Sequence, residues 1–578
     1  MQINKNSPPN KHDVATRLFS VVNASYRKYD YNELGKRTMK SMNIARIDLF
    51  KNNILSTKTY QQGLNKLKKT AATGVSKTLC ALLVTSSFVF IPAHAHSNES
   101  KPNIIFIMSD DQGYGDVSAF NPNSKIATPA IDRLAEEGMM FTDAHSASAV
   151  CTPTRYGVLT GRYPWRTRLQ KGVLSGETSV LPDGTISVGD EPLIDEKTLT
   201  VAQFLKSQGY DTAMTGKWHL GFKYLLPKGT EIDKSRGKFY DAVPIGTKII
   251  GGPIERGFDK YWGFHHARQM GTWIEQDQVT YNLENTDEML NRITEKAVDY
   301  VSDPARKNTP FFLYVPFSAP HSPVVPSKNW IGKSGINKYA DFVMETNNSV
   351  ERILQALDKA KLTDNTIVIF TTDNGTSPSA KFEQLIAAGH HPTADLRGVK
   401  ADIWEGGHRV PYIVRWPGHV KAGSTYSKPV VHNSLFATSA DILKVTLPND
   451  VAVDSFSILP ALKGSEEETH PVAIHASVSG HFAVRVGDWK LAACKGSCGW
   501  SEGGDNNTEM QLYNMKTDRA ETTNLYKQKP EIVAQLKKQL EQAVNNGYSV
   551  EGKTGRNDVP VNIYKSSKVK NKNKRKDH

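Results

Sequence analysis

Residues 102–111 read PNIIFIMSDD, a short apolar run that ends in the two carboxylates Asp110 and Asp111. A continuous apolar run of this length is typical of a strand buried on both faces, as in a parallel sheet. The segment TPAIDRLAEEGMMF (residues 128–141) follows with amphipathic spacing and predicts a helix closed by Gly138. Residues 102–141 therefore predict a strand followed by a helix.

Three later segments repeat this alternation. Residues 198–221 (TLTVAQFLKSQGYDTAMTGKWHLG) predict a helix, a turn and a strand, and residues 309–326 (TPFFLYVPFSAPHSPVVP) a strand that runs into a proline-rich loop. Residues 349–375 (SVERILQALDKAKLTDNTIVIFTTDNG) predict a helix and then a strand that ends in Asp373 and Asn374. We therefore expect an α/β fold, with a large mixed or mostly parallel sheet sandwiched by helices and ligands at its carboxyl edge.

The pattern changes near Tyr426. FAVRVGDWKLAAC (residues 482–494) and MQLYNMK (residues 510–516) alternate as strands do, and residues 529–547 predict an amphipathic helix with a glycine stop. We expect a larger α/β domain over residues 96–425 and a smaller C-terminal antiparallel α+β subdomain over residues 426–560. The glycine- and aromatic-rich insert between residues 223 and 285 is interpreted as surface loops that shape a pocket.

The net charge of +13 lies mostly at the two ends of the chain. Residues 561–578 predict a basic, disordered tail, and residues 1–95 hold the remaining excess. Because the body between them is slightly acidic, a nucleic-acid partner is not expected.

The basic N-terminal segment precedes an apolar run over residues 79–91 that is too short to span a bilayer. The run is followed by Ala93-His94-Ala95, which is typical of a signal-peptide cleavage site. We expect cleavage after Ala95, translation from Met39 or Met42, a periplasmic or secreted enzyme, and no transmembrane anchor.

Export would leave three cysteines in the mature chain. Cys494 and Cys498 form a C-x3-C pair, for which we expect a disulfide in an oxidising compartment. Cys151 then has no partner, and an odd thiol in an exported protein needs an explanation.

Four oxygen-bearing side chains stand at the ends of the first strand and of the later strand in residues 349–375: Asp110, Asp111, Asp373 and Asn374. Either pair alone could serve only to cap a turn. If both strands are central, the carboxylates converge and repel one another unless a cation neutralises them. Oxygen ligands favour a hard cation such as Ca²⁺ or Mg²⁺.

Residues 151–155, CTPTR, match C-x-P-x-R and are followed by YGVLTGRYPWR. With GYDTAMTGKWHLG (residues 209–221) and RGVKADIWEGGHRVPYIVRWPG (residues 397–418), this order of motifs resembles the type I sulfatases over residues 101–530. The resemblance implies an alkaline-phosphatase-like fold, one Ca²⁺ per chain rather than Mg²⁺, and oxidation of Cys151 to formylglycine by a maturation enzyme. It also implies that Asp110, Asp111, residue 151, Asp373 and Asn374 bind the metal.

The aldehyde explains the cysteine. A hydrated aldehyde carries two hydroxyls on one carbon, so that one can attack sulfur and expel the alcohol. The other, once deprotonated, lets the sulfated intermediate collapse and release sulfate. A serine in this position would remain a stable sulfate ester.

The resemblance assigns roles to five further residues. Arg155 would hold the formylglycine hydrate, Lys217 would bind sulfate and His219 would act on a hydrate hydroxyl. Lys217 and His219 are two residues apart, so on a strand they would face the same way. His321 or Lys400 would protonate the leaving oxygen, and we favour His321 with Lys400 bridging.

Two histidine pairs are candidates for substrate contact. His265 and His266, with Arg268, could line a sugar subsite or could form a packed aromatic loop. His390 and His391 lie upstream of Lys400 and could reach the substrate.

Three functions were compared. The first is an exported Ca²⁺-dependent sulfatase that acts on sulfated carbohydrates. A phosphatase or phosphodiesterase of the same superfamily would use Ser or Thr and usually two Zn²⁺, whereas a sulfoglycan-binding protein with a dead site would lack at least one residue of the set. The complete set favours the sulfatase.

Overall fold

The apolar run that opens the described chain forms strand β1 (Asn103–Ser109), all of whose residues are buried. The computed structural model describes residues 101–175, 178–181, 184–188, 191–227, 230, 243–283, 285–504 and 507–565. The expected signal peptide and residues 566–578 of the basic tail lie outside these ranges. β1 lies between β12 (Phe311–Pro316) and β13 (Thr366–Thr372) and is parallel to both. The expected α/β architecture is confirmed.

Within the described residues the large sheet has 14 strands. Its parallel centre is β13, β1, β12, β6 and β9, and antiparallel strands continue it on both sides, so the sheet is mixed. In spatial order the strands are β15 (Ser424–Tyr426), β2 (Met139–Phe141), β14 (Tyr412–Arg415), β13, β1, β12, β6 (Asp211–Lys217), β9 (Lys260–Phe264), β10 (Thr272–Glu275), β11 (Gln278–Asn282), β8 (Lys248–Ile250), β7 (Phe222–Leu225), β5 (Ile186–Val188) and β4 (Thr178–Val180).

The insert between residues 223 and 285 differs from the expectation of surface loops. Over residues 248–282 it supplies β8 to β11, and β9 pairs in parallel with β6. Glycines allow this close pairing, because a Cβ on Gly263 would lie 2.0 Å from the carbonyl oxygen of Gly216. The aromatic residues of the insert are therefore largely strand residues, and the expectation was wrong for this part.

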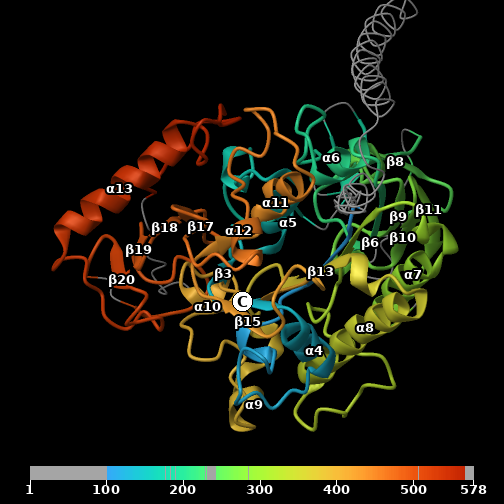
Figure 1. Ribbon diagram of the computed structural model, residues 1–578, viewed down its shortest axis with the longest axis horizontal. Helices are drawn as coiled ribbons and strands as arrows, with labels where there is room; N and C mark the ends of the chain where they lie inside the picture. The colour runs from blue at the N-terminus through green and yellow to red at the C-terminus, as the bar shows by residue number, and fades with distance from the viewer. Residues whose placement is uncertain are drawn as a thin grey trace, which may run out of the picture. The chain divides into compact units, whose positions relative to one another are not determined.

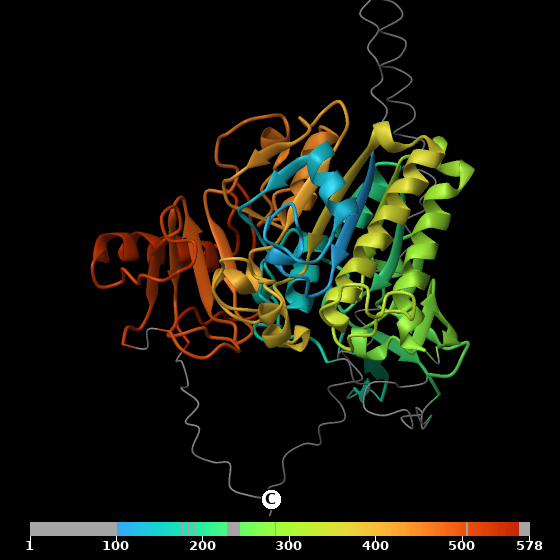
Figure 2. The same cartoon turned by 90° about the horizontal axis from the view of Figure 1, so that it is seen from below.

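Helices cover both faces of the large sheet (Figures 1 and 2). The side chains of β1 alternate, so Ile104 and Phe106 enter one core and Ile105 and Ile107 the other. The helices of the first core are α5 (Cys151–Thr160), α6 (Val201–Ser207), α11 (Ser434–Ile442) and α12 (Leu459–Leu462). The helices of the second core are α4 (Pro129–Glu137), α7 (Met289–Ser302) and α8 (Lys338–Ala360).

The expected C-terminal sheet is confirmed. It is antiparallel, with strands β17 (Ala473–Ala476), β18 (Phe482–Val486), β19 (Trp489–Ala492) and β20 (Gln511–Asn514). Helix α13 (Pro530–Asn545) packs Val533, Leu536 and Leu540 against its apolar face. Figure 1 shows this sheet and α13 at one side of the large sheet.

A short pair of parallel strands, β3 (Ala144–His145) and β16 (Val430–Val431), lies close to both sheets. Next to it, Asp143 is buried and binds three cationic or ionisable side chains. Its carboxylate oxygens lie 2.7 Å from His145 Nε2 and 3.2 Å from both Arg409 and Arg485. Since Arg485 belongs to β18, this cluster connects the smaller sheet to the loops of the larger one.

The described cysteines and helices add two further observations. Cys494 and Cys498 are joined in a disulfide, and Cys151 is the one free cysteine in the described chain. Among the described helices, none combines the length and apolar character that a membrane span requires.

Candidate active site

Two neighbouring strands deliver the acidic cluster. β1 and β13 pair with Ser109 opposite Thr372, so the residues that follow each strand lie side by side. The backbone N–H of Asp111 donates to Asp373 Oδ1 at 3.2 Å, and Asn374 Nδ2 donates to Asp111 Oδ1 at 2.7 Å. Asp110, Asp111, Asp373 and Asn374 are all buried. The structure thus brings together the four side chains that the strand ends predicted.

Cys151 is the first residue of helix α5 and faces this cluster. Its thiol lies 3.5 Å from Asp110 Oδ1 and 3.9 Å from Asp111 Oδ1. Arg155, one helical turn later, binds Asp373 Oδ2 at 2.8 Å and donates to the carbonyl oxygen of Lys217 at 3.1 Å. The start of α5 therefore places both the thiol of Cys151 and the guanidinium group of Arg155 beside the acidic residues that follow β1 and β13.

Two lysines approach the cluster from different elements. Lys217, at the end of β6, places Nζ 2.6 Å from Asp110 Oδ2. Lys400 places Nζ 2.5 Å from Asp111 Oδ1 and 3.3 Å from Cys151 Sγ. Both ammonium groups are buried, so their charges act at low dielectric and not through bulk water.

The strand geometry assumed for His219 is wrong. β6 ends at Lys217, and His219 has a left-handed backbone with φ of 55°, so the two residues do not share a strand face. His219 Nε2 instead donates to the carbonyl oxygen of Leu174 at 3.1 Å. The ring is nevertheless buried beside His266, with 4.3 Å between the ring centroids.

His321 completes the group on the far side of Asp111. It follows β12 in the proline-rich loop, and its Nε2 lies 3.6 Å from Asp111 Oδ2. His266 packs edge-to-face against it at 5.8 Å between centroids. His266 therefore joins the cluster, whereas His265 accepts a hydrogen bond from the backbone of Gly221 and Arg268 is exposed.

The second histidine pair has other surroundings. His390 is buried and its Nε2 binds Asp116 at 2.8 Å, while its Nδ1 accepts from the backbone of Lys125 at 3.2 Å. Both ring nitrogens of His390 are therefore engaged within the protein, and the side chain ties its loop to Asp116. His391 is exposed.

Burial and charge perturb the pKa values of the cluster. Burial disfavours the carboxylate of Asp110, but Lys217, His321 and Arg155 outweigh it and hold the pKa of Asp110 well below its usual range. Burial and the charge of Asp110 raise the pKa of Asp373 to about 7. At Asp373, burial and the neighbouring carboxylate thus outweigh the opposing charges of Arg155 and Lys217.

The thiol and the imidazole are both neutral at pH 7 in this setting. Burial and then Asp373 raise the pKa of the Cys151 thiol far above its ordinary value. Burial lowers the pKa of His321 to about 4, against the opposing effect of Asp111.

The donor set fits a hard cation. Asp111 Oδ2 and Asn374 Oδ1 are buried oxygens without a hydrogen-bond partner. Asp110, Asp111, Cys151 and His321 each offer a ligand atom, and these atoms lie within 4.8 Å of one another. Unpartnered buried oxygens beside clustered carboxylates are what an oxygen-liganded ion such as Ca²⁺ requires.

Gln112 was missed by the sequence reasoning. It is buried directly after Asp111, and neither atom of its amide group has a hydrogen-bond partner. Its place next to a carboxylate pair was visible in the sequence, but an amide carries no charge signal that would single it out.

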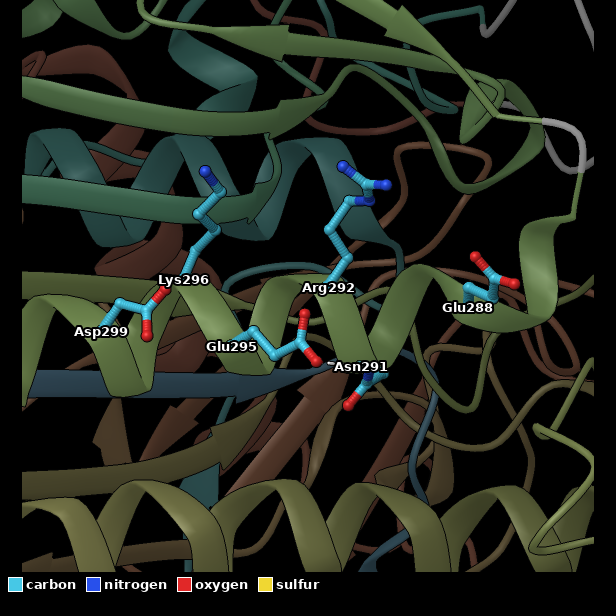
Figure 3. A pocket seen from close by; sticks show the side chains of 6 residues that line it. All are labelled: Glu288, Asn291, Arg292, Glu295, Lys296 and Asp299. Carbon is cyan, nitrogen blue, oxygen red and sulfur yellow. Dashed lines mark hydrogen bonds between the residues drawn. The ribbon is translucent and has the colours of Figure 1, made fainter.

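A hollow on helix α7 is separate from this cluster. Its volume is about 350 Å³, and Figure 3 shows the six side chains that line it, none of which belongs to the cluster. Two of its cations already have partners, since Lys296 pairs with Glu275 at 2.9 Å and Arg292 lies over the ring of Tyr281. We therefore place the active site at the strand ends.

Comparisons with known proteins agree with this geometry. The sulfatase family model matches residues 102–445, and the model described as N-sulphoglucosamine sulphohydrolase, C-terminal, matches residues 399–546. An N-acetylgalactosamine-6-O-sulfatase of Bacteroides thetaiotaomicron is 32% identical over 498 residues, which cover 77% of this chain and 93% of that protein. Human N-acetylgalactosamine-6-sulfatase is 32% identical over 381 residues, covering 62% and 66%.

A solved structure gives the same result. A sulfatase described in connection with glycosaminoglycan metabolism by Bacteroides thetaiotaomicron superposes with a TM-score of 0.65 at 30% identity, covering 77% of this chain and 99% of that one. Fold and site together define a hydrolase of the alkaline-phosphatase-like superfamily. Within it, the chain belongs to the sulfatase family as a type I sulfatase, an enzyme that hydrolyses sulfuric esters. Family membership favours this over the phosphatase alternative.

Proposed function

We propose that this chain is an exported, Ca²⁺-dependent sulfatase that removes sulfate from sulfated carbohydrates through a formylglycine made from Cys151. The observation that carries the proposal is the position of Cys151, whose Sγ lies 3.5 Å from Asp110 and 3.3 Å from Lys400. Residue 151 is thus set between an oxygen-rich cation site and a fixed positive charge.

The raised pKa of Cys151 supports conversion of the thiol. A thiolate is the nucleophilic form of cysteine, and burial beside carboxylates keeps this thiol protonated at neutral pH. The formylglycine hydrate would supply a hydroxyl nucleophile and a second hydroxyl whose loss of a proton releases sulfate. A maturation enzyme in the host is therefore a required partner.

The residues proposed to hold Ca²⁺ are Asp110, Asp111, Asp373 and Asn374, together with the modified residue 151. The bound ion would supply positive charge where negative charge develops during S–O cleavage. Ca²⁺ is preferred over Mg²⁺ because a buried set of protein oxygens suits an ion that needs no retained water shell.

The three buried cations are proposed to have different roles in the reaction. Arg155 orients Asp373 at 2.8 Å, and Lys217 neutralises Asp110 at 2.6 Å while facing the sulfate. Lys400 lies next to residue 151 and stabilises charge on the transferring group. His219 would take the proton of a hydrate hydroxyl. The negative charge of a bound sulfate ester would raise the pKa of His321, so that its imidazolium could deliver a proton to the leaving oxygen.

The substrate class is inferred from the relatives and from the site rim. Two relatives are named for 6-sulfated N-acetylgalactosamine, which makes a sulfated sugar the first substrate to assay. His266, packed on His321, is the proposed sugar contact nearest the chemistry, with the exposed Arg268 beside it. His265, whose ring lies 5.5 Å from that of His219, would support this rim, whereas His390 and His391 are left out of it.

One mass measurement tests the central step. Trypsin releases residues 134–155 as one peptide, since no Lys or Arg lies between Arg133 and Arg155. In active enzyme this peptide should be lighter than the thiol form by the difference between CH₂SH and CHO. An unmodified cysteine in fully active enzyme would contradict the proposal.

Export has its own test. N-terminal sequencing of the protein recovered from the periplasm or medium should begin at His96. Recovery of the chain only from the cytoplasm with its N-terminal segment intact would contradict export and leave the catalytic assignment unaffected.

A further inference from the structure

A groove of about 610 Å³ lies along two segments that also supply the active site. Part of the lining runs from Pro378, four residues beyond Asn374, to the start of helix α9 (Phe382–Ala387), and it consists of Pro378, Lys381, Phe382, Glu383 and Gln384. Val399 lines it too and is bonded directly to Lys400. Trp500 and Ser501 complete the lining. The groove is therefore continuous along the chain with both the metal end and the cation end of the site.

The carboxylate of Asp402 connects Val399 to Trp500 and Ser501, three residues that line the groove. It is fully buried and accepts hydrogen bonds from the backbone N–H groups of Val399, Trp500 and Ser501 at 2.8, 2.7 and 3.0 Å. It also accepts from the hydroxyl of Ser501 at 2.5 Å. One buried carboxylate thus fixes the groove wall to the turn that carries Lys400.

The loop that carries Trp500 is tightly seated. A Cβ on Gly499 would lie 2.4 Å from the carbonyl oxygen of Ala401, so only glycine allows the loop to approach this closely. The disulfide between Cys494 and Cys498 closes the chain immediately before it. Despite this fixed backbone, the indole of Trp500 is 50% exposed. The half-exposed side chain of Trp500 lines the same groove as Phe382, so two aromatic rings are available there for stacking.

We propose that this groove binds the sugar unit next to the sulfated one on the same glycan chain. The flat face of Trp500 would stack on the apolar face of the neighbouring ring, with Phe382 below it. Lys381, an exposed residue of the lining, would pair with a sulfate or carboxylate of that sugar. The inference rests on the proposed function and adds that the enzyme recognises at least two sugars.

A kinetic comparison tests the groove. Sulfate release is measured from 4-nitrophenyl sulfate, from sulfated monosaccharides and from oligosaccharides that contain the same sulfated unit, beginning with 6-sulfated N-acetylgalactosamine. For Trp500→Ala we expect kcat/KM on the oligosaccharide to fall roughly tenfold, mostly through KM, with the aryl sulfate and the monosaccharide unchanged. Trp500→Phe should restore most of the loss because it keeps a stacking face.

The second variant and the control are chosen for the backbone. Lys381 has a left-handed φ of 60°, so Lys381→Asn removes the charge with a residue that tolerates this conformation. Ile386→Ala, on the same helix and 49% exposed, is the matched control because it does not line the groove. Ile386→Ala should leave kcat/KM unchanged for the aryl sulfate, the monosaccharide and the oligosaccharide.

The outcomes separate the two proposals. If Trp500→Ala lowers kcat/KM equally on all three substrates, or on none of them, the proposal of a sugar-binding groove is wrong and the sulfatase proposal is unaffected. Release from 4-nitrophenyl sulfate but from no oligosaccharide would overturn the groove and the carbohydrate substrate class together. No release from any ester by matured enzyme would contradict the proposed function itself.

Discussion

The Nζ atom of Lys400 lies 3.3 Å from the Sγ atom of Cys151. The same ammonium group binds Asp111, so its position is fixed by a residue of the acidic cluster. Lys217 pairs with Asp110 on another element, which leaves the two lysines on different carboxylates. A reacting oxygen on residue 151 would therefore lie beside the ammonium group of Lys400, whose position is fixed by its ion pair with Asp111.

Replacing Cys151 by serine should separate the attack on sulfur from the later release of sulfate. In a host without the maturation enzyme, a serine hydroxyl can attack sulfur once but has no second hydroxyl with which to expel sulfate. We expect release of at most one equivalent of alcohol, followed by arrest, with a sulfate ester on the peptide of residues 134–155. Mass spectrometry of that peptide checks the result. Cys151→Ala, the control, should show neither release nor mass gain, and sustained turnover by the serine variant would refute the need for an aldehyde.

The leaving-group acid can be identified by comparing two esters. 4-Nitrophenolate leaves readily without a proton, whereas a sugar alkoxide does not. If His321 is the acid, His321→Ala should lower kcat on a sugar sulfate by roughly 10²–10⁴-fold and affect 4-nitrophenyl sulfate much less. Lys400→Ala should then reduce both rates to a similar degree, because charge stabilisation is needed for either ester. The reverse pattern would assign the proton transfer to Lys400.

The parts of this site that follow from strand order could be predicted from the sequence. Asp110 and Asp373 each follow a strand with an apolar centre, and adjacent parallel strands end at the same edge of a sheet. The strands of the insert were missed because their aromatic residues alternate with polar ones in short runs that also occur in loops. The geometry of His219 was missed because a positive φ in a non-glycine residue leaves no pattern in composition.

The groove could not have been predicted for a different reason. It depends on Asp402 meeting Trp500 and Ser501, which lie about 100 residues later in the chain. Neither the burial of Asp402 nor the exposure of Trp500 has a periodic signal. Only the packed arrangement of the two loops shows that the carboxylate of Asp402 fixes the backbone of Trp500.

Removing the metal should lower thermal stability as well as activity. Without a cation, Asp111 Oδ2 and Asn374 Oδ1 are buried without partners, and Asp110 and Asp373 repel each other. Calcium at 100 times its Kd should stabilise the folded state by about 2.7 kcal/mol, because it binds the native state alone. Differential scanning fluorimetry of chelator-treated enzyme, titrated with Ca²⁺ and then Mg²⁺, measures this shift. Elemental analysis that finds no bound metal in active enzyme would contradict the assignment.

Neutralising Asp143 should destabilise the protein at neutral pH and matter less in acid. Burial opposes its charge, but Arg409, Arg485 and His145 outweigh burial and hold the pKa of Asp143 well below its usual range. The folded state therefore binds this proton less readily than the unfolded chain, whose aspartates titrate near pH 3.9. The stabilisation is complete above that pH and is lost as the pH falls toward the lower folded value. We expect Asp143→Asn to cost about 3 kcal/mol of unfolding free energy at pH 7, measured in urea, and less at pH 3. Asp358→Asn, which removes an exposed partner of Arg133, is the control and should cost about 1 kcal/mol or less. An Asp143→Asn penalty that is the same at both pH values would show that the ionised carboxylate does not connect the two sheets as described.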